Sequence, residues 1–243
     1  MTVDKFLNDS QLEELREFDT PTICNTIESF KVRKNTEGFM NPSIKCIIPY
    51  EKPIVGYAIT AKISSKKPPT DNEKKLSEIY YKMISESTVP TIAVIEDMDA
   101  EPIGSFWGGV NDSIHAALGC NGVITNGGVR DLEDAKKLGF RYFAKEILVS
   151  HAYCHLAEVN CDVNVGGLVL KFGDLLHADM HGVIIIPHEI SAKLSKACRE
   201  VIAAEEIVIK ACRSAISGKK KIEVENLLKL LKEMKIKRDC LRI

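Results

Sequence analysis

One strand-to-helix unit, between Gly119 and Gly139, constrains the fold of this chain more than any other feature. Val123–Thr125 has the apolar character of a short buried strand, and Asn126–Gly128 is predicted to form a loop. From Asp131 onward, apolar residues recur at helical spacing until Gly139, which is typical of a helix end. A strand that passes directly into an amphipathic helix is the repeating unit of α/β proteins, so this unit favours an α/β fold.

The same alternation of strands and helices extends over most of the chain. Further strands are predicted at residues 54–63, 91–95, 141–149 and 183–186, with a hairpin over 163–170 that turns at Gly166–Gly167. Further helices are predicted at residues 10–18, 20–30 (capped by Asp19), 73–87, 188–217 and 223–236. The glycine-rich segment 104–110 is predicted to lead into another helix, which ends near Gly119. We therefore expect an α/β core over residues 1–187 and a helical segment over 188–243, which packs on this core or on a neighbouring subunit.

Charge and hydropathy exclude several functional classes. The 33 basic and 34 acidic side chains leave a formal net charge of −1, so no basic surface is available to attract nucleic acid or an anionic membrane. No apolar run approaches the ~20 residues of a membrane span, and the polar N-terminus lacks the apolar core of a signal peptide. We therefore expect a cytoplasmic protein that binds neither nucleic acid nor membrane.

Eight scattered cysteines include one arrangement that could hold a metal. No CxxC pair occurs, and in a cytoplasmic chain the cysteines are expected to be reduced. One segment carries four candidate ligands: His151, Cys154, His155 and Cys161. A tetrahedral zinc site usually takes paired ligands from two separate segments, so packing in the core and loops is the favoured role of this cluster.

Arg130 and Asp131 lie side by side where the strand of the central unit gives way to its helix. An arginine can grip a carboxylate with two parallel hydrogen bonds, and an aspartate is a hard oxygen ligand for a divalent cation. The free N–H groups at the start of a helix also favour anions. The alternative is structural, an aspartate at a helix start beside a solvated arginine. The local sequence leaves both interpretations open.

Five segments of the chain, in order, are similar to segments of a known family. They are Asp19–Ile27, Val55–Thr60, the pair Asp71–Asn72, Gly119–Asp131 and Phe172–Pro187. On these motifs the chain resembles the RraA-like proteins, which include the class II pyruvate aldolases acting on 4-hydroxy-4-methyl-2-oxoglutarate and 4-carboxy-4-hydroxy-2-oxoadipate. The resemblance covers about residues 15–215.

The resemblance implies a fold, an assembly and a cofactor. The fold would be α/β, a four-layer α-β-β-α sandwich of the swivelling-domain type, followed here by a C-terminal helical extension. The assembly would be a homotrimer or homohexamer with sites at subunit interfaces. In the aldolase branch a divalent metal, Mg²⁺ or Mn²⁺, is bound at the position matching Asp131. The position matching Arg130 holds the carboxylate and ketone oxygen of the pyruvyl group.

The same resemblance places a glycine-rich segment around the substrate. The cradle would consist of the backbone amides of Gly108, Gly109, Val110 and Asn111. Trp107 would form a wall of the pocket. The chain departs from the aldolases at position 109, where they carry an aspartate and this chain has glycine. Asp112 is a candidate replacement, although its place further along the helix start moves the carboxylate by several ångströms.

Four more residues are candidates for roles around the site. Asn72 belongs to an Asp-Asn pair that helps bind ligand in the family, and capping of the following helix is the alternative. Asp179, His181 and Glu206 are candidates to support the site without touching substrate, Glu206 from a neighbouring subunit. His177 and His181 could also move a proton, although hydrogen bonding within the fold is the more common role of such histidines.

These features favour a divalent-metal-dependent lyase acting on a small 2-oxo or hydroxy acid. A cation beside Arg130 would stabilise the pyruvate enolate that retro-aldol cleavage or oxaloacetate decarboxylation produces. Two alternatives stay open. Gly109 permits a non-catalytic regulator, like the family members that inhibit a ribonuclease. The histidines at 151, 155, 177 and 181 leave room for a lyase or decarboxylase acting on a different hydroxy acid.

Overall fold

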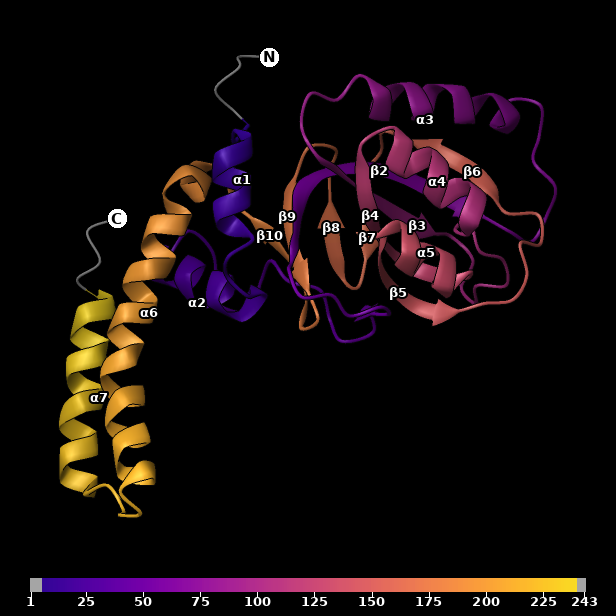
Figure 1. The fold of residues 1–243 in the computed structure, drawn as a ribbon. Helices are drawn as coiled ribbons and strands as arrows, with labels where there is room; N and C mark the ends of the chain where they lie inside the picture. Colours follow the sequence, from indigo (N-terminus) through magenta and orange to yellow (C-terminus); the bar gives the residue numbers. More distant parts are fainter. Residues whose placement is uncertain (1–5, 240–243) are drawn as a thin grey trace.

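The computed structural model describes residues 6–239, in which helices surround a mixed β-sheet (Figure 1). The strands are β1 (Lys45–Cys46), β2 (Ile54–Ser64), β3 (Thr91–Asp97), β4 (Cys120–Val129), β5 (Arg141–Ile147), β6 (His155–Val159), β7 (Val163–Val165), β8 (Leu168–Leu170), β9 (Leu175–Asp179) and β10 (Gly182–Ile186). The helices are α1 (Asp9–Leu15), α2 (Thr20–Phe30), the short 3-10 helix η2 (Glu73–Lys75), α3 (Leu76–Ser85), α4 (Gly109–Ala117), α5 (Leu132–Leu138), α6 (His188–Ser217) and α7 (Val224–Asp239). Within the described range, no helix is long and apolar enough to cross a membrane.

The strands within residues 6–239 form one large sheet and one small hairpin. The large sheet has the order β1-β5-β4-β3-β2-β9-β10, and β6 pairs with the second half of β2. Strands β2 to β5 run parallel to one another, whereas β1, β6, β9 and β10 pair antiparallel. β7 and β8 form the separate hairpin. The sheet is strongly curved. Phe39 forms a bridge with β10 at one edge, and β1 pairs with β5 at the other, so that the two edges nearly meet.

The alternation of side chains along β2 separates an inner core from two outer ones. Ala58 faces the inside of the curved sheet, where the β7–β8 hairpin also packs. On the opposite face, Tyr57 packs with residues of α1, α2 and α6. Ile63, further along that face, packs with residues of α3, α4 and α5. The order helices, strands, strands, helices confirms the expected four-layer α-β-β-α arrangement.

The C-terminal helices start on the core and then leave it. The first half of α6 buries Ile190, Leu194 and Cys198 against the core that it shares with α1 and α2. Its second half extends away from the sheet with α7 alongside (Figure 1), and α7 has no buried residues. The C-terminal helical extension is therefore confirmed, whereas the division of the chain into units at residue 187 stays a prediction.

The predicted loop at Asn126–Gly128 is wrong, because these residues lie inside β4. The ladder between β4 and β5 shifts register there. On the other side of β4, beyond the last backbone pair with β3, the Asn126 side chain hydrogen bonds to the N–H (2.7 Å) and the C=O (3.0 Å) of Asp97. Gly127 suits this bulge because a Cβ at that position would lie 2.9 Å from Oδ2 of Asp97. The glycines serve close packing within the sheet rather than a turn.

Candidate active site

A cavity of about 320 Å³ lies where the loop before α4 meets the junction of β4 and α5. Its lining residues are Phe106, Trp107, Gly108, Val110, Asn111, Arg130, Asp131 and His151. Because β3, β4 and β5 are parallel, their carboxyl ends and the segments that follow them meet at one edge of the sheet. The structure thus brings together the predicted Arg-Asp pair, the predicted tryptophan wall and most of the predicted glycine cradle.

Asp131 is turned toward α4 rather than toward its own helix. It occupies the N-cap position of α5, the helix start of the structural alternative, but its side chain makes no capping hydrogen bond there. Its backbone adopts the left-handed conformation (φ 55°, ψ 44°), which a non-glycine residue adopts at some cost. Its Oδ2 accepts a hydrogen bond of 3.0 Å from the N–H of Gly109. The carboxylate is therefore held at the mouth of the cavity.

The guanidinium of Arg130 makes no polar contact within the described residues. The side chain is half-buried, and among residues 6–239 it has neither an ion-pair partner nor a hydrogen-bond acceptor. Its Nε is buried without a partner, and the same is true of Nε1 of Trp107 on the adjacent wall. A buried donor left unsatisfied costs roughly 1–3 kcal/mol, so two of them at one cavity indicate a place for an acceptor-rich ligand.

Gly108 and Gly109 differ in how much room surrounds them. A Cβ on Gly108 would lie 2.8 Å from Oδ2 of Asp131 and 3.2 Å from Nε of Arg130. A Cβ on Gly109 would meet nothing closer than Oδ2 of Asp134 at 3.6 Å. Only Gly108 is therefore required by close packing. At position 109 a side chain would fit, and it would point among carboxylates.

The start of α4 presents free backbone donors to the cavity. Gly109, Val110 and Asn111 form its first turn, where N–H groups have no partner within the helix. The N–H of Gly109 is taken by Asp131, which leaves those of Val110 and Asn111. The side chain of Asn111 is already engaged, since it donates to the C=O of Phe106. A helix start with free N–H groups beside an unpaired arginine is suited to an anion.

Asp112 does not reach the cavity and is completely buried behind it. One carboxyl oxygen accepts a 3.3 Å hydrogen bond from the N–H of Gly108, and the other bonds with the hydroxyl of Tyr142. Burial raises the pKa of Asp112 to about 6, even though these two hydrogen bonds lower it. The prediction that Asp112 directly replaces the acid missing at position 109 is therefore wrong.

His151 and Phe106 line the cavity although sequence reasoning gave neither of them this role. His151 follows β5, which pairs with β4, so its loop lies next to the Arg130–Asp131 junction. No local pattern signals this placement, because it depends on the neighbour of β5 in the sheet. Two other residues of the predicted His-Cys cluster do not line the cavity. Cys154 is buried in the core beneath α3, α4 and α5, and Nε2 of His155 lies 3.7 Å from Oε1 of Glu73.

Asn72 and Glu206 lie outside the cavity of the single chain. Asn72 is exposed beside η2 and makes no capping hydrogen bond, so the capping alternative for it is wrong. Thr70 takes that role through reciprocal hydrogen bonds with Glu73. Glu206 lies on α6 within 4.0 Å of two basic residues of the same helix.

Asp179 and His181 also lie elsewhere, at the end of β9. Asp179 accepts 2.8 Å hydrogen bonds from the N–H groups of Thr20 and His181. Burial alone would raise the pKa of Asp179, but these hydrogen bonds outweigh it and hold the pKa below its ordinary value. His177 is buried and bonds with Oγ1 of Thr20 and the C=O of Leu15, and burial lowers its pKa to about 4. Through Thr20, the hydrogen bonds of Asp179 and His177 connect α2 to β9.

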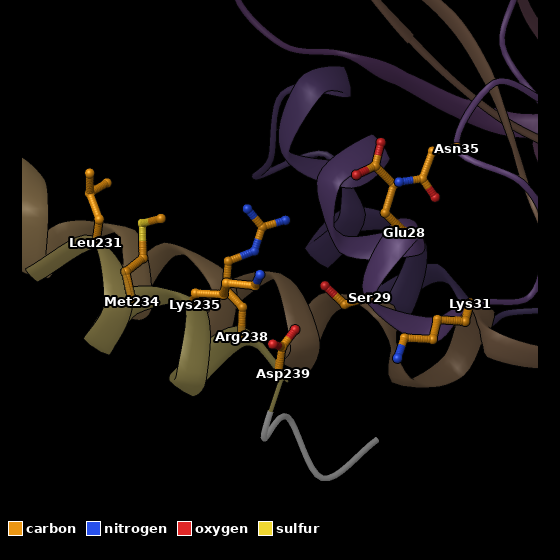
Figure 2. Close-up of a pocket in the computed structure, with 9 residues that line it drawn as sticks. All are labelled: Glu28, Ser29, Lys31, Asn35, Leu231, Met234, Lys235, Arg238 and Asp239. Atoms are coloured by element: carbon orange, nitrogen blue, oxygen red, sulfur yellow. The ribbon is translucent and has the colours of Figure 1, made fainter. Parts of the chain in front are cut away.

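A larger cavity, of about 530 Å³, lies between α2 and α7 (Figure 2). Side chains of both charges line it, including Glu28, Lys31, Lys235 and Arg238. Arg238 is already engaged with the C=O of Asn25, and it lies 3.6 Å from Glu205. Among the described residues, none of the buried polar atoms that lack a partner belongs to this cavity's lining. Of these two cavities, the unsatisfied donors therefore favour the smaller one as the candidate site.

The chain belongs to the RraA-like family, since the family model described as Aldolase/RraA matches residues 20–185. An uncharacterised protein of Methanocaldococcus jannaschii is 30% identical over 172 residues, which cover 68% of this chain and 76% of that protein. A protein of Halalkalibacterium halodurans named "Putative 4-hydroxy-4-methyl-2-oxoglutarate aldolase" is 24% identical over 135 residues. That match covers 55% of this chain and 60% of the relative.

Solved structures share the fold at lower identity. RraAS2 of Streptomyces coelicolor, described as an unusual member of the RNase ES inhibitor RraA protein family, has a TM-score of 0.65 at 16% identity. The match covers 82% of this chain and 96% of RraAS2. A structure described among novel cellulases from microbes associated with the gut ecosystem has a TM-score of 0.71 at 20% identity, covering 85% of this chain and 90% of that chain. These likenesses show the fold alone.

Proposed function

We propose that this protein is a divalent-metal-dependent lyase for a small 2-oxo or hydroxy acid, working by retro-aldol cleavage or oxaloacetate-type decarboxylation. The observation that carries the proposal is the half-buried guanidinium of Arg130, which has no acceptor among the described residues although it borders a cavity. A planar cation without a partner in such a place suits a carboxylate ligand. The relative named as an aldolase supports the same class of reaction.

The carboxylates at the cavity fit a hard divalent cation. Oδ2 of Asp131 and Oδ2 of Asp134 lie 3.9 and 3.6 Å from the point that a Cβ of residue 109 would occupy. Within residues 6–239, no group of three or more His, Cys, Asp or Glu side chains is arranged to hold a metal. Mg²⁺ and Mn²⁺ often take one or two carboxylates together with waters and substrate oxygens. Bound there, such an ion would act as a Lewis acid beside the reacting oxygen.

The chain's own residues would bind and orient the substrate. The guanidinium of Arg130 would hold the carboxylate of the pyruvyl unit in a bidentate pair, which also brings positive charge to the oxygen that gains charge in the enolate. The free N–H groups of Val110 and Asn111 would donate to the same end of the substrate. Trp107 would shield this end from water, since only 1% of its surface is exposed.

Proton transfer distinguishes the two reactions. Retro-aldol cleavage needs a group that takes the proton of the substrate hydroxyl, and Gly109 cannot supply it. His151 lines the cavity and is the side chain best placed to do so, because an imidazole nitrogen can accept a proton. Decarboxylation of oxaloacetate requires no such base. We therefore propose that His151 is needed for aldol cleavage and dispensable for decarboxylation.

Exposed apolar side chains at the rim favour a homo-oligomer, a trimer or a hexamer. Val110 at the cavity is 76% exposed, and Val149, two residues from His151, is 93% exposed. Apolar side chains next to a polar cavity are commonly covered by a partner. A second copy of the chain seated on this rim would close the site and could contribute Glu206.

A non-catalytic regulator is the second candidate. It is favoured by Gly109, because the aldolases carry a carboxylate at that position and this chain has room for one but lacks it. Membership of RraAS2 in an RNase inhibitor family shows that the same fold is used for such a role. A regulator would have no need of the unpaired Arg130, which is why we favour the lyase.

The test is pyruvate release from oxaloacetate and from 4-hydroxy-4-methyl-2-oxoglutarate, with Mg²⁺, with Mn²⁺ and with EDTA. The lyase predicts metal-dependent release that Arg130→Ala abolishes and that Lys82→Ala, which removes an exposed basic side chain of α3 outside the cavity, leaves intact. Decarboxylation without aldol cleavage would show that binding is intact and the proton acceptor inadequate. No release from either substrate would favour a different hydroxy acid or the regulator.

A further inference from the structure

The buried carboxyl of Asp112 has no role in the proposed reaction and yet lies directly behind the cavity wall. Its exposed fraction is 0%, and among residues 6–239 no basic side chain pairs with it. Its two partners are the N–H of Gly108, at 3.3 Å, and the hydroxyl of Tyr142. A carboxyl group kept away from water and from cations is costly, so its retention calls for a function.

Tyr142 connects this carboxyl to the Arg130–Asp131 peptide. Its hydroxyl lies 3.0 Å from the C=O of Arg130 as well as within bonding distance of Asp112. A phenol has one proton, so it can donate to Arg130 while bonded to Asp112 only if Asp112 donates to it in turn. Burial raises the pKa of Asp112 to about 6, so this continuous chain of hydrogen bonds forms below that pH, whereas above it Tyr142 donates to the carboxylate. Burial also raises the pKa of Tyr142, which keeps the phenol protonated.

Both ends of this chain of bonds are walls of the cavity. The C=O of Arg130 belongs to the peptide that leads into Asp131, whose left-handed backbone aims its carboxylate at α4. The N–H of Gly108 belongs to the peptide that begins the cradle. These two walls approach so closely that a Cβ on Gly108 would lie 2.8 Å from Oδ2 of Asp131. Their relative position decides where that carboxylate points.

We propose that Asp112 and Tyr142 are a positioning pair that holds the Gly108 peptide and the Arg130–Asp131 peptide in place, so that the Asp131 carboxylate faces the cavity. Neither side chain is part of the cavity lining, and both act through the backbone. The consequence for metal binding rests on the proposed function. The geometric role does not, and it can be measured in metal-free protein.

Four variants separate this role from general stability. Tyr142→Phe removes the hydroxyl, and Asp112→Ala removes both of its hydrogen bonds. Asp112→Asn keeps them, because the carboxamide oxygen can accept from Gly108 while its NH₂ donates to Tyr142. Tyr57→Phe is the matched control: it removes another buried phenol, which accepts a 2.8 Å hydrogen bond from the N–H of Leu7 in the core of α1, α2 and α6.

The first readout is hydrogen exchange of the Gly108 and Gly109 amides, since these report on the Asp112 and Asp131 contacts. We expect exchange at least ~10-fold faster in Tyr142→Phe and Asp112→Ala, and within about threefold of the parent protein in Asp112→Asn and Tyr57→Phe. Parent-like exchange in Tyr142→Phe would overturn the proposal, as would equal acceleration in Tyr57→Phe. If the first two variants do not fold, fast exchange in Asp112→Asn would overturn it and parent-like exchange would support it.

The second readout is the Kd for Mn²⁺, measured by electron paramagnetic resonance. We expect it to rise about 10-fold or more in Tyr142→Phe and to stay near the parent value in Asp112→Asn and Tyr57→Phe. An unchanged Kd in Tyr142→Phe would contradict the positioning of Asp131. If the parent protein itself binds no Mn²⁺, the proposed metal site fails, and the exchange data still decide whether the pair positions the two peptides.

Discussion

Replacing Gly108 with alanine is expected to disable the site at a moderate cost in stability. The added Cβ would lie 2.8 Å from Oδ2 of Asp131, whereas such atoms pack at roughly 3.5 Å. The carboxylate would have to move by about 0.7 Å, the difference between these distances, and this weakens its 3.0 Å hydrogen bond to Gly109. The fold tolerates the movement because the carboxylate is the free end of an exposed side chain.

The activity should be far more sensitive than the fold. A misplacement of about 1 Å can lower a rate roughly 10²-fold, so we expect kcat/KM for pyruvate release to fall by about that factor. The Kd for Mn²⁺ should rise at least ~10-fold. Gly108 has a φ of 157°, a backbone conformation that residues with a side chain rarely adopt and that costs them roughly 1–3 kcal/mol, so the melting temperature should also fall by several degrees.

Gly109→Ala is the neighbouring comparison for this experiment. Its Cβ would lie 3.6 Å from the nearest atom, which is ordinary contact, so we expect kcat/KM and the Kd for Mn²⁺ to stay within about threefold. Pyruvate release, Mn²⁺ binding and thermal unfolding, measured in parallel on Gly108→Ala and Gly109→Ala, test whether the contact with Asp131 causes the loss of activity. The reasoning is refuted if Gly108→Ala keeps parent values, or if both alanine variants lose function equally.

Three other outcomes can be measured with the same assays. Arg130→Ala should lower turnover at least ~10²-fold, and Arg130→Lys should not restore it, because lysine lacks the bidentate fork; recovery with lysine would argue against that fork. Asp131→Ala should abolish metal-dependent release without changing the melting temperature, and normal turnover would disprove its metal role. Burial raises the pKa of Asp112 from 3.8 to about 6, so between these values the folded chain keeps a proton that the unfolded chain has lost. Stability relative to Asp112→Asn should therefore fall as pH rises from about 4 to about 6, by up to roughly 3 kcal/mol, and denaturant unfolding below and above this window should show it. A stability difference that does not change with pH would contradict a proton on Asp112.

Features that depend on neighbouring residues were predictable from the sequence. Asp19 caps α2 as expected, with its side chain accepting a 2.8 Å hydrogen bond from the N–H of Thr22. The hairpin of β7 and β8 turns at Gly166–Gly167, both of which have positive φ angles. In each case the interacting groups lie within a few residues of one another, so the local pattern contains the whole interaction.

The partners of the site residues were not predictable in this way. Asn126–Gly128 follows the pattern of a loop, yet it lies in β4 because the Asn126 side chain pairs with Asp97 on the adjacent strand. Asp131 follows the pattern of a helix cap, yet it bonds to Gly109 on another helix. Each of these partners is distant in sequence and becomes a neighbour only when the parallel strands are in register.

The sequence by itself therefore determined the α/β class, the family, and the presence of Arg130 and Asp131 at a strand-to-helix junction. Tertiary structure alone decided that the carboxylate of Asp131 faces α4, that His151 enters the cavity, and that Asp112 is buried behind it. The physical reason is that periodicity and capping are short-range effects, whereas the direction and protonation of a side chain depend on what packs against it from distant parts of the chain.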